Sequence, residues 1–311
     1  MQIEEVEYFK YSVTRFTKSN KIKIVIGGLI DLFIQDFTLM KSCLFSRPVA
    51  LIGTDIAITH VGWLLRIRSY VFNEDDFVVN RSFCKFAYPF ASFIISPNVC
   101  NVGKYAFKKV GYEGYQKLAY LHPKRFRPDR SKITEYVGHD KYFMIRLVSL
   151  SAGHDIEKDH KGLSYGDLKQ VIDIVEPNGK VFISSEKPLP QDLKKYSFNF
   201  PVNIIHHLMY YCEMFISDSQ SMTVECCMLG VPNIRVNTFV GKISVLEELE
   251  RKYQLTLGIH PDEKELLFNK VRDYSNNNEL RSLFNSRREK MLSEKIDVTS
   301  FFFNLVTGKP N

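Results

Sequence analysis

Residues 214–237 read MFISDSQSMTVECCMLGVPNIRVN, and this stretch decides the fold. Its apolar start predicts a strand, which the polar turn 218–221 follows. Residues Met222–Leu229 predict a helix that ends at Gly230, because glycine readily adopts the left-handed conformation at a helix C-terminus. Pro232 then returns the chain to an extended conformation, and Asn233–Val236 predict a second strand. A strand, a turn, a helix and a strand in this order are typical of a parallel sheet covered by helices.

The same alternation continues on both sides of this stretch. Short, continuously apolar segments predict further buried strands at 49–53, 68–72, 93–96, 142–148 and 181–184. Helical stretches lie between them, for example Ile56–Leu65 and Leu163–Val175, the second with Ser164 as its N-cap residue. The chain is therefore predicted to have an α/β fold.

Residues 111–130 interrupt the alternation. They are rich in Gly, Pro, Tyr and basic residues and have little periodicity, as expected of a connector. The length of 311 residues allows two domains, since one domain typically has about 100–200 residues. We predict two α/β domains, at 1–115 and 131–311, joined by a connector at 116–130, with the last helix crossing back to the first domain.

The charge and the apolar segments limit the partners and the location. Lys and Arg number 42 and Asp and Glu 35, a net charge of +7. This mild excess suits anionic small molecules or an anionic membrane surface, but it is too small to indicate nucleic-acid binding. The chain starts without an apolar signal segment, and no apolar run reaches the about 18 residues of a spanning helix. We therefore expect a cytoplasmic protein, with peripheral contact to the inner face of the membrane. The segment 22–40 is open to interpretation as an amphipathic core helix, as a strand leading into a helix, or as a membrane-docking helix.

The six cysteines show no metal-ligand spacing, and two of them, Cys226 and Cys227, are adjacent in an apolar run. Adjacent cysteines are poorly placed to bridge each other or to bind one metal ion. We expect all six to be reduced core residues.

The turn 218–221 is a candidate phosphate site. Unpaired backbone N–H groups and the positive end of the helix dipole meet where a strand passes into a helix. Ser219, Ser221 and Thr223 add hydroxyl donors. Glu225 lies further along the helix, where its carboxylate can accept the hydroxyls of a ribose. The alternative interpretation is an ordinary N-cap cluster followed by a solvated glutamate.

The spacing from Asp218 to Pro232 resembles the nucleotide-binding signature of non-hydrolysing UDP-N-acetylglucosamine 2-epimerases and, more loosely, of two-Rossmann-domain (GT-B) glycosyltransferases. In the epimerases a serine and two following glycines contact the UDP phosphates, and those positions are Ser219, Gln220 and Ser221 here. The glutamate that binds the uridine ribose matches Glu225. Both glycines are replaced, so the backbone approach to a phosphate is expected to differ.

Five further strings resemble the family known as "domain of unknown function 354". They are GYEGYQKLAYLHPKRF, FISSEKPLP, HHLMYYCEMFISDSQSMTVE, IRVNTFVGK and EKIDVTSFF, and they occur in one order over residues 45–303. This family is placed in the GT-B-like superfamily and is often encoded among surface-polysaccharide genes. The resemblance implies a GT-B-like α/β fold of two Rossmann-like domains with a central cleft, and the reaction of the family is not settled. Members of the family usually begin with a strand–loop–helix unit, and no such unit is recognisable before Val49, so the N-terminal domain is expected to be shortened.

Other candidate residues follow predicted strands of the second half. His154 and Gly153 lie in a loop expected over the cleft, where His154 could contact diphosphate or act as a base, as the corresponding histidine does in the epimerases. Lys187 could offset diphosphate charge, and Arg235 and Asn237 would face the sugar end of a donor. For each of these residues a structural role is the alternative: a surface loop, a solvated turn or an ion pair between domains.

His206 resembles a residue that borders the nucleobase in GT-B enzymes, with a packed or capping role as the alternative. His206 and His207 have no third ligand at metal-binding spacing, so no metal site is predicted there.

Carboxylates follow two strands of the first half. Glycosyl transfer with inversion needs one carboxylate or histidine to deprotonate the acceptor hydroxyl. Asp55, Glu74, Asp75 and Asp76 are available, and we rank Asp55 and Asp75 first as catalytic residues. The acidic run could instead be a solvated loop or hold a divalent ion.

These observations lead to one favoured function and two alternatives. We predict a GT-B-like glycosyltransferase that uses a nucleotide-diphosphate sugar, preferably a UDP-sugar, with a glycan or lipid-linked acceptor and no required cofactor. The first alternative is a nucleotide-sugar 2-epimerase. Asn80-Arg81 resembles an epimerase step, but Phe77-Val78-Val79 stands where the epimerases have an acidic pair. The second alternative is an inactive GT-B-like binding or scaffold protein.

Overall fold

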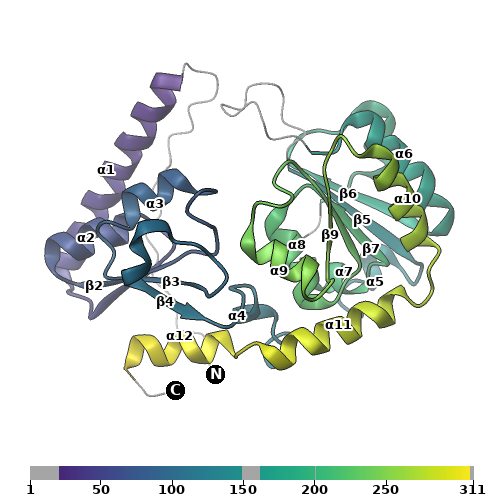
Figure 1. Ribbon diagram of the computed structural model, residues 1–311. Coiled ribbons are helices and arrows are strands. Elements are labelled where there is room, and N and C mark those ends of the chain that lie inside the picture. The colour runs from purple at the N-terminus through teal and green to yellow at the C-terminus, as the bar shows by residue number, and fades with distance from the viewer. Residues whose placement is uncertain (1–20, 149–161, 200, 309–311) are drawn as a thin grey trace. The chain divides into compact units, whose positions relative to one another are not determined.

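The computed structural model describes residues 21–148, 162–199 and 201–308, which fall into two compact units (Figure 1). Unit 1 consists of Met1–Asn73, Asn80–Ser96 and Val102–Val110. Unit 2 consists of Glu74–Val79, Pro97–Asn101 and Gly111–Asn311. The expected connector 116–130 is thus part of unit 2, as are two short segments that follow strands of the first sheet.

Unit 1 is built on a four-stranded sheet with the order β1-β2-β3-β4. The strands are β1 (Ala50–Gly53), β2 (Arg68–Phe72), β3 (Phe93–Pro97) and β4 (Lys109–Tyr112). β1, β2 and β3 run parallel, with Ile52 beside Tyr70 and Val71 beside Ile94. Three of these strands were predicted from their apolar runs, whereas β4 was not.

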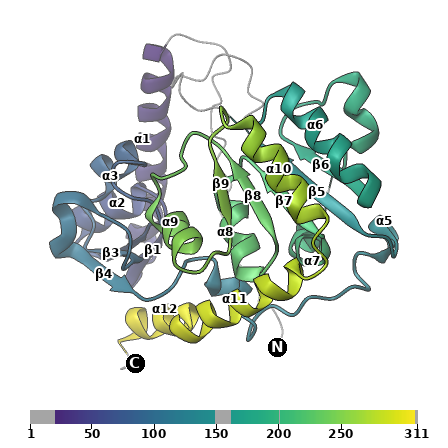
Figure 2. The same cartoon turned by 45° about the vertical axis from the view of Figure 1, so that its right-hand side comes forward.

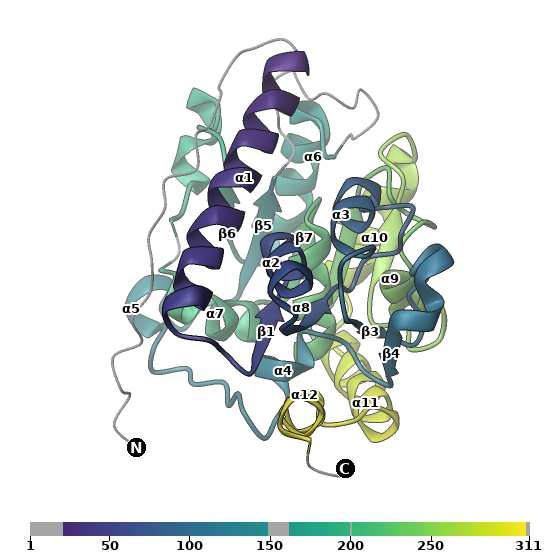
Figure 3. The same ribbon diagram turned by 90° about the vertical axis from the view of Figure 1, so that its left-hand side faces the viewer.

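Helix α1 (Lys21–Phe45) precedes this sheet and packs along α2 (Ala57–Leu65), as Figure 3 shows. Between Lys21 and Ala50 the structure has this helix and no strand, as the sequence indicated. Apolar side chains join α1 to the rest of unit 1: Leu39, Met40 and Cys43 of α1 pack with Leu51, Ile58, Val61, Leu65 and Ile67. Helix α3 (Arg81–Ala87) and a 3₁₀ helix at Gly103–Lys108 complete the unit.

Unit 2 is built on a five-stranded parallel sheet with the order β6-β5-β7-β8-β9. The strands are β5 (Tyr142–Leu147), β6 (Lys180–Ser185), β7 (Met214–Ser217), β8 (Asn233–Val236) and β9 (Leu257–Ile259). The first four were predicted, but β9 was not. Two parallel sheets with helices confirm the predicted α/β fold.

Two neighbouring rows of this sheet have opposite character. One row of register partners is apolar and consists of Ile183, Ile145, Ile216, Ile234 and Leu257. The next row, which we call the polar row, consists of Ser184, Arg146, Ser217, Arg235 and Gly258. Successive residues of a strand point to opposite faces, so the two rows face opposite sides of the sheet.

Each face of the sheet has its own helices (Figures 1 and 2). The apolar row packs against α6 (Tyr165–Val175) and α10 (Lys264–Ser275), which contribute Leu168, Val171, Leu267 and Val271 to one core. Helix α8 (Gln220–Leu229) contacts β7 and β8. The polar row faces the side away from α6 and α10.

Other helices connect or flank these elements in unit 2. They are α4 (Leu118–Leu121), α5 (Thr134–Val137), α7 (Ile205–Tyr211), α9 (Ser244–Arg251), α11 (Leu280–Glu294) and α12 (Val298–Thr307). Helix α12 packs on α4, and its N-cap Asp297 accepts hydrogen bonds from Arg125 at 2.9 Å and from the Ser300 amide at 3.2 Å. Just before α12, the Lys295 ammonium lies 3.1 Å from Glu248 and above the Tyr115 ring. These contacts attach the C-terminal helices to the rest of unit 2.

All six cysteines are buried and unbridged, which confirms their expected core role. Within the described residues, no helix combines the length and the apolar character that a membrane span requires.

Candidate functional site

The candidate phosphate site is the first turn of α8, directly after β7. The Ser219 hydroxyl caps the helix by accepting the Met222 N–H at 3.4 Å, and the Ser219 N–H donates to Ser217 Oγ at 2.7 Å. The Thr223 hydroxyl donates to the Ser219 carbonyl at 2.6 Å. The turn is therefore held by its own side chains, and two of the predicted hydroxyl donors already have structural partners.

The next two amides are differently placed. Over the part of the chain that the structure describes, the backbone N–H groups of Gln220 and Ser221 have no hydrogen-bond partner. Ser221 is exposed and Gln220 is half-buried. Amides of a first helical turn that lack a partner can donate to an anion, and the helix dipole favours negative charge there. Gln220 and Ser221 thus retain the donors that a phosphate needs.

Glu225 lies further along the same helix, and its carboxylate has two partners. The Tyr120 hydroxyl of α4 donates to Oε1 at 2.7 Å, and His206 Nε2 of α7 lies 3.5 Å from Oε2. The Tyr120 and His206 rings are 5.6 Å apart, and Phe126 lies 6.0 Å from His206. Burial raises the pKa of the Tyr120 phenol, and the negative Glu225 raises it further, so this hydroxyl stays a donor. Glu225 is therefore bordered by aromatic rings rather than fully solvated.

His207, next to His206, has a structural partner. Its Nδ1 accepts the N–H of Asp129 at 3.0 Å, and burial lowers the pKa of its imidazole. Among the described residues, no group of three or more His, Cys, Asp or Glu side chains could hold a metal ion.

Arg235 was predicted to meet a phosphate or a sugar, but its guanidinium is fully buried in the polar row. Its Nη2 lies 3.5 Å from Glu250 Oε2 of α9, so its partner is a carboxylate of the same unit. Burial lowers the pKa of Arg235 and raises that of Glu250, while each charge opposes the shift of the other. Sequence reasoning had weighed an ion pair between domains, whereas this pair joins β8 to α9 inside unit 2.

Asn237 is also buried. Its amide donates to the Asp218 carbonyl at 3.2 Å, and its Oδ1 accepts the Phe239 N–H at 3.0 Å. The Asp218 carboxylate accepts the Val148 N–H at 2.7 Å. Together these bonds connect the carboxyl ends of β5, β7 and β8 around the start of α8. Their observed role is to fix the backbone of the site.

A cation that the sequence analysis missed, Arg146, lies in the polar row of the five-stranded sheet. Arg146 of β5 is the register partner of Ser217, two residues before the α8 N-cap. Its guanidinium is partly exposed and bonds Ser184 Oγ at 2.8 Å and Glu186 at 2.9 Å. The signal was present as a single charged residue inside the apolar strand YFMIRL. Lys187, the cation that was predicted instead, is half-buried, and its N–H donates to Ser185 Oγ at 3.2 Å.

The carboxylates of the first half have structural contacts. Asp55 accepts the Ala57 N–H at 2.7 Å at the start of α2. Asp76 is buried and accepts the Ser244 amide and hydroxyl at 2.8 and 2.9 Å, and Glu74 accepts the Gln116 N–H at 2.7 Å. Asp75 is half-buried after β2. The catalytic roles of Asp55, Asp75 and His154 stay predictions, as does the sugar- or phosphate-binding role of Gly153; His154 and Gly153 lie outside the described residues.

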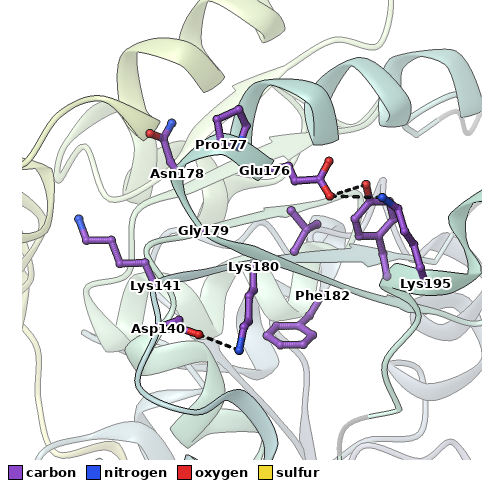
Figure 4. Close-up of a pocket in the computed structure, with 11 residues that line it drawn as sticks. Asp140, Lys141, Glu176, Pro177, Asn178, Gly179, Lys180, Phe182 and Lys195 are labelled. Carbon is purple, nitrogen blue, oxygen red and sulfur yellow. Dashed lines mark hydrogen bonds and ion pairs between the residues drawn. The ribbon is translucent and has the colours of Figure 1, made fainter.

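A separate hollow of about 760 Å³ lies on unit 2 (Figure 4). It is lined by residues such as Asp140, Lys141, Lys180 and Lys195, and the Lys180 ammonium pairs with Asp140 at 2.8 Å. Asp140, Lys141 and Lys180 stand at the amino ends of β5 and β6, and Lys195 lies in the 3₁₀ helix Gln191–Tyr196. Ligands of open parallel sheets bind at the carboxyl ends of the strands, where α8 begins. The hollow is therefore distinct from the candidate site.

The fold matches solved structures of two kinds. A UDP-GlcNAc 2-epimerase of Methanocaldococcus jannaschii, in complex with UDP-GlcNAc and UDP, is 15% identical with a TM-score of 0.55, covering 79% of this chain and 74% of that chain. MnaA of S. aureus, solved with UDP, is 11% identical with a TM-score of 0.59, covering 94% and 85%. The spinosyn forosaminyltransferase SpnP is 11% identical with a TM-score of 0.54, covering 86% and 78%.

No protein-family model and no curated protein matches the sequence, so the resemblance to the domain of unknown function 354 stays a prediction. At these identities the solved structures show the fold alone. The chain has the GT-B-like α/β fold of the epimerases and glycosyltransferases.

Proposed function

We propose that this protein is a GT-B-like glycosyltransferase that binds a nucleotide-diphosphate sugar, preferably a UDP-sugar, at the start of α8. One observation carries the proposal. At the carboxyl edge of the five-stranded sheet, the available amides of Gln220 and Ser221 lie on the same helix as the half-buried carboxylate of Glu225. An anion site followed by an acceptor of hydroxyl hydrogen bonds fits a diphosphate joined to a ribose.

In the proposed complex each group has a distinct task. The amides of Gln220 and Ser221 and the Ser221 hydroxyl donate to the diphosphate, and Arg146 offsets its charge. Glu225 accepts the ribose hydroxyls, and His206 borders the base. Donors fixed before the reaction stabilise the charge that develops on the departing diphosphate, so no metal ion or other cofactor is needed.

The other half of the reaction needs a base for the acceptor hydroxyl. Asp55, Asp75 and His154 are the candidates for the base that deprotonates the acceptor hydroxyl. The acceptor that we propose is a glycan or a lipid-linked sugar in surface-polysaccharide synthesis, at the inner face of the cytoplasmic membrane. The similarity in fold to SpnP, which is a glycosyltransferase by its name, supports this reaction class.

The nearest competing function is epimerisation of a UDP-sugar, because epimerases are also among the solved structures of this fold. Proton abstraction at a sugar carbon needs a base and an acid on opposite faces of the ring. The sequence has Phe77-Val78-Val79 where the epimerases have an acidic pair. We therefore favour transfer over epimerisation.

Ligand binding is tested by thermal unfolding with UDP-, GDP-, CMP- and dTDP-linked sugars. A ligand at 100 times its dissociation constant stabilises the folded state by about 2.7 kcal/mol, which gives a measurable rise in Tm. We expect this rise with the UDP-sugars, and its loss in Glu225→Ala. Glu213→Ala is the matched control, because Glu213 is an exposed carboxylate of the same unit. A Tm rise of equal size in Glu225→Ala would remove this residue from ribose binding.

The reaction is tested by following UDP-N-acetylglucosamine by proton NMR, with and without a lipid-linked acceptor. Transfer predicts release of UDP that depends on the acceptor. Interconversion of the donor without an acceptor would establish the epimerase alternative. Binding without release or interconversion would leave the protein as an inactive GT-B-like binding module.

A further inference from the structure

Helix α1 carries an apolar stripe on the surface. Ile30, Phe33, Ile34, Phe37 and Leu44 are 51%, 72%, 45%, 56% and 67% exposed. At 100° per residue these five positions fall on one side of the helix. Leu39 and Cys43 lie on the other side of the helix, and together with Met40 at the border of the stripe they pack into unit 1. The helix therefore has a second apolar face beyond the one that its own core uses. We call these five exposed residues the α1 stripe.

Exposed apolar side chains are concentrated in unit 1 as a whole. Of the 21 large apolar residues that are exposed in the described part of the chain, 13 belong to unit 1, although unit 2 is the larger unit. Among them are Phe45, at 95%, and Trp63, at 63%. Exposed apolar side chains that gather in this way mark an interaction surface, whereas scattered ones need no explanation.

The positive charge of the protein is concentrated in the same unit. Unit 1 has 14 Lys and Arg against 6 Asp and Glu, a net charge of +8, so unit 2 accounts for −1 of the total of +7. Basic residues adjoin the C-terminal end of the stripe. Lys41 is exposed within it, and Arg47 donates to the Leu65 carbonyl at 2.8 Å, next to the exposed Arg66. The apolar surface and the excess positive charge therefore occur together.

We propose that unit 1 docks on an anionic lipid surface through the α1 stripe, with Lys41, Arg47 and Arg66 close to the headgroups. An amphipathic helix lies in the bilayer interface with its apolar face among the acyl chains, and basic residues add attraction to anionic lipid. A second copy of the chain would bury the stripe equally well. It would, however, bring two units of +8 together, whereas an anionic bilayer neutralises that charge. This inference does not depend on the proposed glycosyl transfer.

The experiment is co-sedimentation of the full chain with two kinds of vesicle: phosphatidylcholine alone, and a mixture of phosphatidylcholine and phosphatidylglycerol. We expect binding to the mixed vesicles, little binding to the neutral ones, and release by high salt, which screens exposed charges. Phe33→Ser with Phe37→Ser should weaken the partition into mixed vesicles by at least about tenfold, because two large apolar side chains are lost. Lys41→Glu with Arg66→Glu should weaken it as well.

The matched control is Val202→Ser with Leu266→Ser, which removes two exposed apolar side chains of unit 2. It should bind the mixed vesicles like the unaltered protein. Because Trp63 is the one tryptophan of the sequence, Trp63→Phe with Phe37→Trp places a single fluorescent reporter on the stripe. Its emission should shift to shorter wavelength with the mixed vesicles.

Three results would overturn the proposal. One is equal or absent binding to both kinds of vesicle. Another is unchanged binding by the Phe33→Ser, Phe37→Ser variant, provided that its Tm matches that of the unaltered protein. The third is a dimer in solution that this variant abolishes, which would assign the stripe to a second copy of the chain. The nucleotide-dependent rise in Tm is measured separately, so failure here and failure of the proposed function are distinguishable.

Discussion

The Tyr120 hydroxyl donates a 2.7 Å hydrogen bond to the Glu225 carboxylate, and so a residue of α4 occupies the group that we assign to the ribose. If a nucleotide binds there, the ribose hydroxyls and Tyr120 compete for one carboxylate. Without a ligand, the Glu225 carboxylate thus already accepts a hydrogen bond from the protein itself. Nucleotide binding would replace the Tyr120 hydroxyl by a ribose hydroxyl as the donor.

Tyr120→Phe removes this competitor and keeps the ring. Since a hydrogen bond to a charged group contributes about 1.5–3 kcal/mol, and about 1.4 kcal/mol is a factor of ten, we expect UDP to bind at least about tenfold more tightly by calorimetry. Glu225→Gln, which keeps the shape of the side chain, should bind more weakly. Weaker binding by Tyr120→Phe would show that Tyr120 orients Glu225 and does not compete with the ligand.

Substitutions of the two serines of the α8 turn should have different effects, one on the stability of the protein and the other on UDP binding. Ser219 caps the helix, so Ser219→Ala should lower the free energy of unfolding by about 1 kcal/mol. Ser221 is exposed, and Ser221→Ala should leave the unfolding free energy unchanged while it weakens UDP binding. Urea unfolding and calorimetry on the same preparations check both statements. Equal affinity in Ser221→Ala and the unaltered protein would exclude its hydroxyl from the phosphate site.

Gly258 leaves room for the buried ion pair of the polar row. A Cβ atom at this position would lie 2.7 Å from Arg235 Nη2 and 2.9 Å from Glu250 Oε2. Gly258→Ala should therefore destabilise the protein by about 1–3 kcal/mol, as overpacking typically does. Gly166→Ala is the matched control, because a Cβ atom there would have no neighbour within 4 Å and alanine favours a helix. If urea midpoints show equal stability for both variants, the ion pair is free to move.

Asp297 should make stability depend on pH in the acid range. Burial by itself raises the pKa of this carboxyl, but hydrogen bonds from Arg125 and Ser300 outweigh burial and lower the pKa from 3.8 to about 2. A depressed carboxyl pKa stabilises the folded state above about pH 4, and this contribution is lost as the pH falls towards about 2. The difference in Tm between the unaltered protein and Asp297→Asn should be full at neutral pH and should shrink over that interval.

The control is Asp140→Asn, which affects an exposed ion pair with Lys180 and should change the Tm little at any pH. A Tm difference for Asp297→Asn that stays constant from neutral pH to about pH 2 would contradict the assigned role of this carboxylate.

The fold could be predicted where local composition determines structure. The strand Met214–Ser217 and the N-cap Ser164 were found from the sequence because buried parallel strands are continuously apolar and serine caps helices. β9 was missed because three residues with a central glycine, Leu257–Ile259, give no periodic signal. β9 is defined by its pairing with β8 in the sheet, which its own sequence does not reveal.

The site could be predicted only in part. The α8 turn is local in sequence, so its cap and donors were recognised. Tyr120 and Arg146 reach the site through the connector and through the strand order β6-β5-β7, which no spacing in the sequence encodes. Arg235 ends a strand and was therefore assigned to a ligand, but Glu250 of α9 holds it in the interior.

The enclosure of Arg235, Glu250 and Gly258 also constrains how the sequence can diverge. Without Glu250 the Arg235 charge would be buried without a partner, without Arg235 the half-buried Glu250 carboxylate would lose its cation, and a residue larger than Gly258 would displace both. The three positions are thus expected to co-vary among homologues, with an apolar residue at 235 accompanied by a neutral one at 250 and by freedom to lose the glycine. Homologues should therefore differ from this protein at all three positions together and not at one of them alone.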